Sequence, residues 1–422
     1  MNTVAEPSSF TARVVPLTEA VELNPRPDRG AVPDALEVTF VPMATVGAAT
    51  GRIAATEVRR FGEVKKGYTV FREGDVLFAK ITPCMENGKM AVARGLRNGV
   101  GCGSTEFHVL RPKPGVDPQY IYRFVSSARF RAEAAHHMTG AVGQKRVPAT
   151  FLEQCEIPLP DLEEQRRIVA EIEKQFSRLD EAVANLERVT GTLNRYRDAI
   201  LAAAIDGSII GEPPSAAIPI GSTIATLDQG WSPQCESEPA SRPDEWAVIK
   251  TTAIQPMAFL SAENKRLPQA LVARPGLELR AGDLLVTRAG PRSRVGVACA
   301  VRSTRPRLML CDKAYRMRLN AAVADSRYME IVLNAPMVRD AIDELKTGIS
   351  DSGVNLTQKR FRDLCVPVPS LVRQSEIVAE VDRRLSIVRE VESEVDANRR
   401  RAQALRQAVL ARAFAAMSEP GQ

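Results

Sequence analysis

IPLPDLEEQRRIVAE, at residues 157–171, and VPVPSLVRQSEIVAE, at residues 366–380, are two versions of one segment. They lie 209 residues apart and share two prolines, a leucine, a glutamine and the closing I-V-A-E. Because proline fixes φ at about −65° and suits the approach to a first helical turn, each segment predicts a helix that begins after its second proline. A helix start that is written twice at a fixed distance indicates an internal repeat.

A second pair of segments extends the repeat towards the N-terminus. GDVLFAKITP, at 74–83, matches GDLLVTRAGP, at 282–291, with an offset of 208 residues. The same offset relates three further pairs: Phe107 and Tyr315, Tyr120 and Tyr328, Thr139-Gly140 and Thr347-Gly348. A chain of 422 residues exceeds the usual size of one core, so the repeat predicts a globular block and a helix, followed by a second block and helix.

Each globular block has the pattern of a mixed α/β domain. Short β-rich runs at 76–78 and 284–286 are bounded by Gly, Asp and Pro, and helices are expected at 118–136 and 326–345. The predicted fold class is therefore α/β, with two pseudo-repeated mixed domains separated by two long helices. The expected boundaries are 1–160 for the first domain, 161–208 for the first helix, 209–369 for the second domain, and 370–422 for the second helix and tail.

Apolar residues in both predicted helices follow heptad spacing. In the first helix they are Val169, Ile172, Phe176, Leu179, Val183 and Leu186. In the second they are Val378, Val381, Leu385 and Val388, then Val391 and Val395. The step of three from Val388 to Val391 breaks the strict heptad, and the pattern resumes at Ala402, Leu405 and Val409. So narrow a seam is typical of a coiled coil. We expect the two internal copies to pair with each other rather than with their own domains or another chain. The short connection at 207–220 favours an antiparallel pair.

Composition limits the classes of function. The 57 Lys and Arg residues against 51 Asp and Glu give a formal charge of +6, which is compatible with an anionic partner. Seven cysteines without a C-x-x-C pair, together with three histidines, argue against a structural zinc site or a disulfide framework. No uninterrupted run approaches 18 apolar residues, and the sequence starts without a basic, then apolar leader. We therefore expect a cytoplasmic protein with no membrane span and no cofactor of its own.

The twofold layout, the repeated P-x-P-x-L-x-x-Q-x-x-I-V-A-E segment and the heptad helices together resemble the specificity subunit of type I restriction–modification enzymes. KGYTVFREGDVLFAKITPCMENGKM, at 66–90, and GSTEFHVLRP, at 103–112, are similar to one common class of its target-recognition domains. The resemblance covers nearly the whole chain. It implies two DNA-reading domains, an antiparallel helical spacer and no catalysis by this subunit. It also implies two bound copies of an adenine methyltransferase subunit, which would bind S-adenosylmethionine, and a nuclease and translocase subunit that can join them.

Polar and cationic residues in the loops after the G-D strands are the candidate contacts to double-stranded DNA. Such side chains can meet phosphates or base edges, asparagine suiting adenine and lysine or arginine suiting guanine. In the first domain they are Lys80, Thr82, Asn87 and Lys89, and in the second Arg288, Arg292, Ser293 and Arg294. The basic loops that follow each Thr-Gly pair add Gln144, Lys145, Arg146, Asn355, Lys359 and Arg360. Both loops contain Q-K-R, but 214 residues apart and outside the repeat offset, so we interpret that identity as coincidence.

Two hypotheses for the function remain, and they belong to different classes of protein. In the first, the helices act as a ruler between two diverged readers, and the chain recognises a bipartite, asymmetric DNA site. In the second, a coiled-coil scaffold bridges proteins without touching DNA. A nuclease is disfavoured, because Pro33-Asp34 followed by Glu63-Val64-Lys65 is only a short, degenerate imitation of a nuclease motif. A G-x-x-x-x-G-K-[ST] loop is absent from the sequence, so ATP-driven translocation is not encoded here.

Overall fold

Two long helices, α6 (Leu162–Ile205) and α10 (Leu371–Ala415), organise the chain. The computed structural model describes residues 12–26, 28, 30–54, 56–141, 143–348 and 350–415. Each long helix begins two residues after the second proline of the repeated segment, as the sequence predicts. The contacts of the chain divide it into two units, one of residues 1–186 with 397–422 and the other of residues 187–396. Each long helix contributes to both units.

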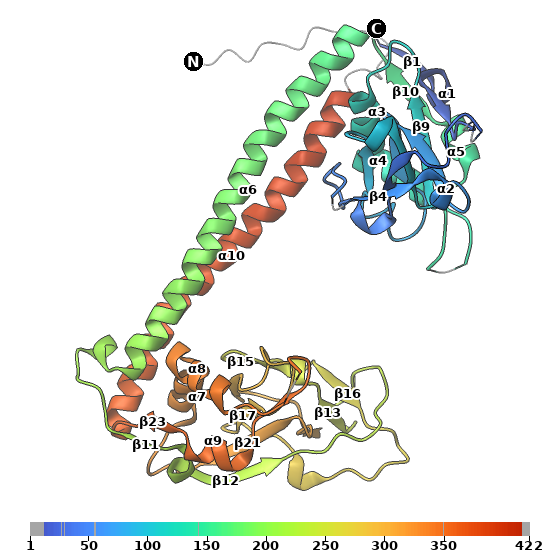
Figure 1. Ribbon diagram of the computed structural model, residues 1–422. Helices are drawn as coiled ribbons and strands as arrows, with labels where there is room; N and C mark the ends of the chain where they lie inside the picture. The colour runs from blue at the N-terminus through green and yellow to red at the C-terminus, as the bar shows by residue number, and fades with distance from the viewer. Residues whose placement is uncertain are drawn as a thin grey trace, which may run out of the picture. The chain divides into compact units, whose positions relative to one another are not determined.

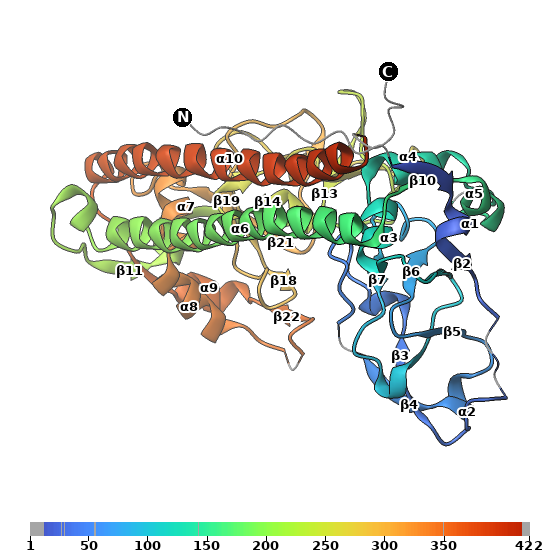
Figure 2. The same ribbon diagram turned by 90° about the horizontal axis from the view of Figure 1, so that it is seen from above.

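The long helices pack against each other as an antiparallel pair. In the first unit, Ile172 and Phe176, near the start of α6, share a core with Leu410, near the end of α10. In the second unit, Leu201, near the end of α6, shares a core with Val381, near the start of α10. Both views of the ribbon show the two helices side by side (Figures 1 and 2). The predicted antiparallel coiled coil is confirmed.

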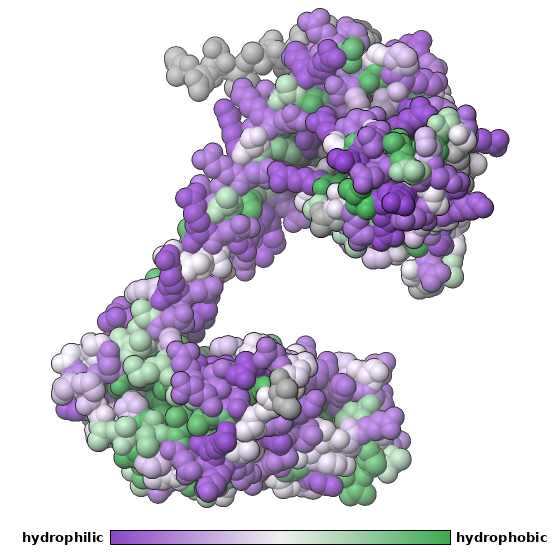
Figure 3. Space-filling view, in the orientation of Figure 1, coloured by the Kyte–Doolittle hydropathy of each residue, from purple (hydrophilic) through white to green (hydrophobic). Residues whose placement is uncertain are grey.

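Ion pairs add to the apolar seam of the two helices. Arg197 of α6 bonds Glu392 of α10 at 2.6 Å, and Asp180 of α6 pairs with Arg406 of α10. The outer surface of both helices is mostly hydrophilic on the face shown in Figure 3. Solvated outer positions around a narrow apolar seam are what a two-stranded coiled coil requires.

At one position the predicted seam is wrong, because Leu405 is 53% exposed. Val378 is half-buried and packs against the core of the second unit, beside the buried Ile377. Beyond Leu405 the buried positions are Leu410 and Phe414. The last turns of α10 therefore turn their apolar side towards the globular part of the first unit.

The aromatic contacts of Phe414 explain this shift. Its ring lies 5.4 Å, centroid to centroid, from both Tyr120 and Phe124 of helix α3 (Pro118–Val125). Burying a large aromatic ring in the domain core outweighs continuing the heptad, because the ring removes more apolar surface from water than a seam position would. The end of α10 is thus both spacer and domain core.

The first unit contains two four-stranded sheets. One sheet has the order β2-β9-β6-β7 and the other β4-β3-β8-β5. Their strands are β2 (Val21–Leu23), β3 (Glu37–Val41), β4 (Glu57–Arg60), β5 (Thr69–Arg72), β6 (Val76–Ala79), β7 (Met90–Val92), β8 (Val100–Gly103) and β9 (Phe107–Pro112). A two-stranded sheet pairs β1 (Arg13–Pro16) with β10 (Glu156–Leu159). The other helices are α1 (Leu17–Ala20), α2 (Phe61–Val64), α3, α4 (Ala128–His136) and α5 (Ala149–Gln154), with short 3-10 turns η1 (Met43–Thr45) and η2 (Arg97–Gly99).

The second unit repeats much of this plan. Its main sheet has the order β12-β21-β17-β19, and a smaller sheet has the order β16-β13-β20. The strands are β11 (Ala217–Pro219), β12 (Ile224–Gln229), β13 (Ala247–Ile249), β14 (Ile254–Gln255), β15 (Ala258–Phe259), β16 (Asn264–Arg266), β17 (Leu284–Thr287), β18 (Ala289–Gly290), β19 (Ala298–Ala300), β20 (Leu308–Met309), β21 (Ala314–Leu319), β22 (Val354–Asn355) and β23 (Cys365–Pro367). The helices are α7 (Ser326–Asn334), α8 (Pro336–Leu345) and α9 (Gln358–Asp363), with 3-10 turns η3 (Ser208–Ile210), η4 (Ile220–Thr223), η5 (Thr251–Ala253) and η6 (Pro275–Leu277).

Strand register corrects one detail of the repeat. Ala79 pairs with Phe107 across β6 and β9, whereas Thr287 pairs with Ala314 across β17 and β21. The offset along β9 and β21 is therefore 207, and Tyr315 occupies the position of His108 rather than that of Phe107. Their roles agree, since a ring nitrogen of His108 lies 2.9 Å from the carbonyl oxygen of Val147 and the hydroxyl of Tyr315 donates to the carbonyl of Leu356 at 2.9 Å.

The repeated glutamine ties each long helix to its domain. Gln165 is 1% exposed; its amide oxygen accepts from the backbone N–H of Asp117, which caps α3, and its amide nitrogen donates to the carbonyl of Pro160, both at 2.8 Å. Gln374 makes the same two bonds, with Asp325 and Pro369. No helix among the described residues is long and apolar enough to cross a membrane.

Candidate nucleic-acid interface

In the first domain, two distant segments meet beside the end of β6. The backbone N–H of Thr82 donates to the carbonyl of Lys145 at 2.9 Å, and that of Val147 donates to the carbonyl of Lys80 at 2.8 Å. Arg146 lies between these two bonds and forms an isolated β-bridge with Ile81, the residue that follows Lys80. The structure thus brings four of the predicted contact residues together from two loops.

The second domain joins the equivalent segments in the same way. The backbone N–H of Leu356 donates to the carbonyl of Arg288 at 2.8 Å, and Ala289 pairs with Asn355 in a short ladder of β18 and β22. The backbone N–H of Arg292 donates to the carbonyl of Asp351, also at 2.8 Å. The predicted loop residues of this domain are therefore also grouped.

Comparison of the two ladders settles which basic-loop residues are equivalent. Arg146 bridges Thr139, and Asn355 bridges Thr347, so Asn355 takes the place of Arg146. Lys359 and Arg360 lie one element further on, in α9, the counterpart of α5. The two Q-K-R triplets are therefore in different places, and their identity is coincidence, as the sequence offset indicates.

The predicted residues differ in exposure. The exposed ones are Asn87, Gln144, Lys145, Ser293, Asn355, Lys359 and Arg360. The half-buried ones are Lys80, Thr82, Lys89, Arg146, Arg288, Arg292 and Arg294. The exposed group can reach a ligand without rearrangement, whereas several members of the second group have internal partners.

Two of the half-buried cations fasten the recognition loop to a second loop. The Nζ of Lys89 donates to the carbonyl of Met43 at 3.1 Å, and the Nη2 of Arg294 donates to the carbonyl of Thr251 at 2.9 Å. Met43 and Thr251 begin η1 and η5, the equivalent 3-10 turns of the two domains. In the first domain the backbone N–H of Ala49 also donates to the carbonyl of Gly88 at 2.9 Å. These second loops could not be predicted from the sequence, because residues 43–54 and 251–255 share no recognisable pattern.

Two arginines of the second domain are held from several sides. Arg292 bonds Asp343 at 2.6 Å and Asp351 at 3.1 Å. The guanidinium carbon of Arg288 lies 5.7 Å from the centre of the Tyr315 ring, and its buried Nε has no hydrogen-bond partner in the part of the chain that the structure describes. Arg292 supports the loop, while Arg288 keeps one unsatisfied donor beside it.

Arg146 and Glu106 form a two-bonded ion pair in the first domain. The Nε of Arg146 donates to Oε2 of Glu106 at 2.9 Å, and its Nη2 donates to Oε1 at 2.8 Å. Its Nη1 donates to the carbonyl of Gln144 at 3.0 Å. The hydrogen bonds from Arg146, and the charges of Arg146 and Lys80, lower the pKa of Glu106, so the carboxylate stays ionised. Glu106 was not among the predicted residues.

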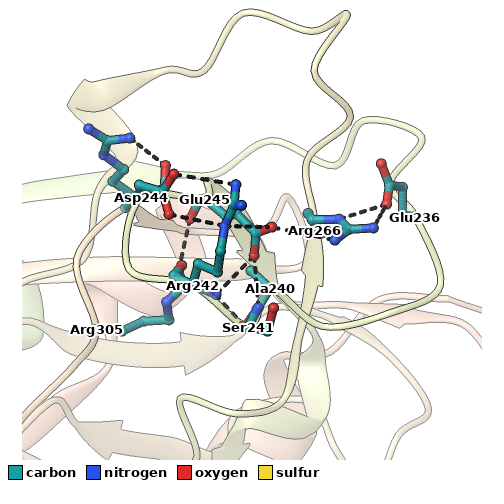
Figure 4. A network of polar contacts seen from close by, with 9 residues as sticks. Glu236, Ala240, Ser241, Arg242, Asp244, Glu245, Arg266 and Arg305 are labelled. Carbon is teal, nitrogen blue, oxygen red and sulfur yellow. Dashed lines mark hydrogen bonds and ion pairs between the residues drawn. The ribbon is translucent and has the colours of Figure 1, made fainter.

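A further charged cluster of the second domain is satisfied internally. Arg266 donates to Glu236 at 2.7 Å and to Glu245 at 3.4 Å, and Arg305 donates to the backbone carbonyl of Arg242 (Figure 4). These bonds fix the segment 236–245 against the small sheet of β13, β16 and β20. The carboxylates of this cluster pair with Arg242 and Arg266, and Arg305 bonds backbone carbonyls. Because these donors are already used inside the domain, the cluster is not part of the candidate interface. Among the described residues, no group of three or more His, Cys, Asp and Glu side chains is placed to hold a metal ion.

Comparison with known proteins agrees with the resemblance read from the sequence. A family model described as the type I restriction modification DNA specificity domain matches residues 14–188. The Type I restriction enzyme EcoEI specificity subunit of Escherichia coli is 30% identical over 456 aligned residues, which cover 87% of this chain and 76% of that subunit. The EcoAI specificity subunit of Escherichia coli is 40% identical over 166 residues, covering 39% of this chain and 28% of that subunit.

The fold is shared with solved structures at low sequence identity. A chain from a structural study of complex assembly and conformational transition of the type I R-M system is 20% identical, with a TM-score of 0.73 and coverage of 97% of this chain and 99% of that chain. The identity and coverage of the EcoEI relative carry the assignment, and the matching fold agrees with it. The chain belongs to the family of type I restriction enzyme specificity subunits.

Proposed function

We propose that this chain is the DNA sequence-specificity subunit of a type I restriction–modification system, and that it reads a bipartite, asymmetric site. The observation that carries the proposal is the pair of equivalent loop clusters, one in each repeat, which hold different side chains at the same positions. Lys80 and Arg146 of the first cluster are replaced by Arg288 and Asn355 in the second. Since guanine and adenine edges select arginine and asparagine respectively, two such clusters would read two different words.

The proposed division of the chain follows the sequence repeat. Residues 1–160 and 209–369 are the two target-recognition domains, and residues 161–208 and 370–422 are the spacer helices with the tail. A helix of 44 residues is roughly 65 Å long at a rise of 1.5 Å per residue, or about two turns of duplex DNA at 34 Å each. A rod of this kind explains why the bases between the two words would not matter.

We assign two roles to the candidate contact residues. Those with exposed heads, such as Lys145 and Asn355, meet phosphates or bases directly. Those with internal partners, such as Lys89, Arg292 and Arg294, hold the loops in shape and add positive potential. Lys80, Thr82, Arg146 and Arg288 are half-buried, but they lie at the centre of the clusters, and we assign them direct contacts as well. The remaining direct contacts are Asn87, Gln144, Ser293, Lys359 and Arg360.

The chain acts with other subunits, in the cytoplasm. It docks two copies of an adenine methyltransferase subunit, which bring S-adenosylmethionine, and a nuclease and translocase subunit can join them. The chain itself selects the site and does no chemistry. The support for these partners is membership of the family, whose members are named as specificity subunits of restriction enzymes.

Deletion of the gene, followed by mapping of methylated adenines by long-read sequencing, tests this function. The proposal predicts that one split motif, two short words around a fixed unspecified gap, loses its methylation relative to the parent strain. Purified complexes should also bind DNA containing that motif with an affinity that falls steeply as salt rises, because phosphate contacts release counterions. A protein-bridging scaffold would leave the methylation map unchanged and would show no DNA binding.

A further inference from the structure

The two repeats carry different residues at one pair of facing positions, although both repeats form the same backbone hydrogen bonds there. In the first domain the backbone N–H of Lys80 donates to the carbonyl of Glu106, and in the second that of Arg288 donates to the carbonyl of Lys313. Lys313 is therefore the counterpart of Glu106, and Asn355 is the counterpart of Arg146. The same ladder forms in the second domain without a carboxylate and without an arginine at these places. A ladder of this kind can therefore form without a charged pair at these two places.

The ion pair with Glu106 leaves some N–H groups of the Arg146 guanidinium available to a ligand. Arginine has five N–H bonds, and Arg146 gives one from Nε, one from Nη2 and one from Nη1 to Glu106 and Gln144. One N–H remains on each terminal nitrogen. The Arg146 side chain is 43% exposed, so these donors can be reached from solvent. Two N–H bonds on neighbouring nitrogens match the O6 and N7 acceptors of guanine.

Glu106 also decides how the guanidinium is held. Its side chain is 25% exposed, and its carboxylate accepts hydrogen bonds from Nε and Nη2 of Arg146 at 2.9 and 2.8 Å. A flexible side chain that is fixed before binding loses less entropy when it meets a base. The negative charge of Glu106 also offsets part of the positive charge of the loop, which weakens contacts to phosphate that do not depend on sequence.

We propose that Arg146, positioned by Glu106, reads one guanine of the word recognised by the first domain. Arg146 is the base-reading residue and Glu106 is a positioning residue. The proposal rests on the proposed function, since it presupposes that the first domain reads DNA. The second domain, with Asn355 and Lys313 at these positions, reads a different base there.

Glu106→Gln and Arg146→Lys test the proposal in cells that carry the complete system. The methylated motif should lose its requirement for guanine at one position of one word in both variants, while the other word stays as in the parent. Glu37→Gln is the matched control, because Glu37 also accepts from Nε and Nη2 of an arginine, Arg97, on the same domain. That variant should leave both words unchanged.

DNA with 7-deazaguanine, which lacks the N7 acceptor, gives a second readout that does not depend on variant stability. In the unaltered complex one such replacement in the first word should weaken binding about tenfold, the size of a good base contact. In the Arg146→Lys complex the same replacement should cost little. The proposal is overturned if both variants keep the parent motif, or if no guanine of the first word is sensitive. If the parent system has no split motif at all, the proposed function fails instead.

Discussion

Gln165 and Gln374 illustrate what a single repeated residue does in this chain. Each is buried at the start of a long helix, and its amide bonds two backbone groups of the domain that precedes the helix. The sequence shows that both are shared by the repeats but does not reveal the partners, since one of the two bonded groups lies about 50 residues away. The structure shows that they join helix to domain rather than touch a ligand.

Gln165→Ala should therefore destabilise the protein without changing its specificity. The change leaves the partly buried N–H of Asp117 and carbonyl of Pro160 without their partner, which costs about 2–4 kcal/mol in total. Urea unfolding of the full chain, followed by circular dichroism, should show a lower midpoint. Gln175→Ala is the control in the same helix; Gln175 bonds the side chain of Glu171 at the surface, so its loss should change stability by less than about 0.5 kcal/mol. Equal midpoints for the two variants would refute the joining role.

Lys145 represents the exposed cations of the recognition loops. Lys145→Ala should weaken DNA binding by a similar factor for specific and unrelated sequences, and should reduce the slope of log affinity against log salt by about one. Fluorescence anisotropy of the assembled complex over a salt series measures both quantities. Lys113 supplies the control. It follows the last residue of β9, whereas the recognition loops lie beside the first residue of that strand, so Lys113→Ala removes the same charge away from the loops. An unchanged slope for Lys145→Ala would place this loop away from the phosphates.

At the scale of elements, the long helices were the most predictable part of the fold. Their starts after Pro160 and Pro369, their pairing and their direction follow from proline geometry, a narrow apolar seam and a short connection. The exposure of Leu405 does not follow, because the aromatic core of the first unit buries Phe414 at the end of α10. The second loops beside η1 and η5 were also beyond prediction, since backbone carbonyls receive Lys89 and Arg294 and leave no trace in residue type.

Matched lengthening of both helices should lengthen the gap between the two words. Seven residues added to α6 after Leu186 and seven to α10 after Asp396 keep the seam in phase and add about 10 Å, or roughly three base pairs. The methylation map of cells with this variant gives the gap directly. Seven residues added to α6 alone should disrupt the pairing and abolish methylation. A doubly lengthened protein that keeps the parent gap would contradict the ruler.

At the scale of the whole molecule, the two halves share their structural contacts but differ in the loop side chains that we propose to bind DNA. The clamping glutamines, the tyrosine hydroxyls that bond Pro158 and Pro367, and the loop ladders are common to both halves. The loop side chains differ, as Arg146 and Asn355 do. A protein with two structurally equivalent domains and different loop side chains should recognise two DNA words. Replacement of one domain should then change only one of the words.

Replacement of residues 1–160 by the corresponding domain of another specificity subunit tests this claim most directly. The measurement is the map of methylated adenines in cells that carry the chimaera and the native partner subunits. If each domain reads one word, one word of the split motif should change, while the other word and the length of the gap remain those of the parent. A map in which both words change together, or in which neither does, would contradict the assignment of one word to each domain.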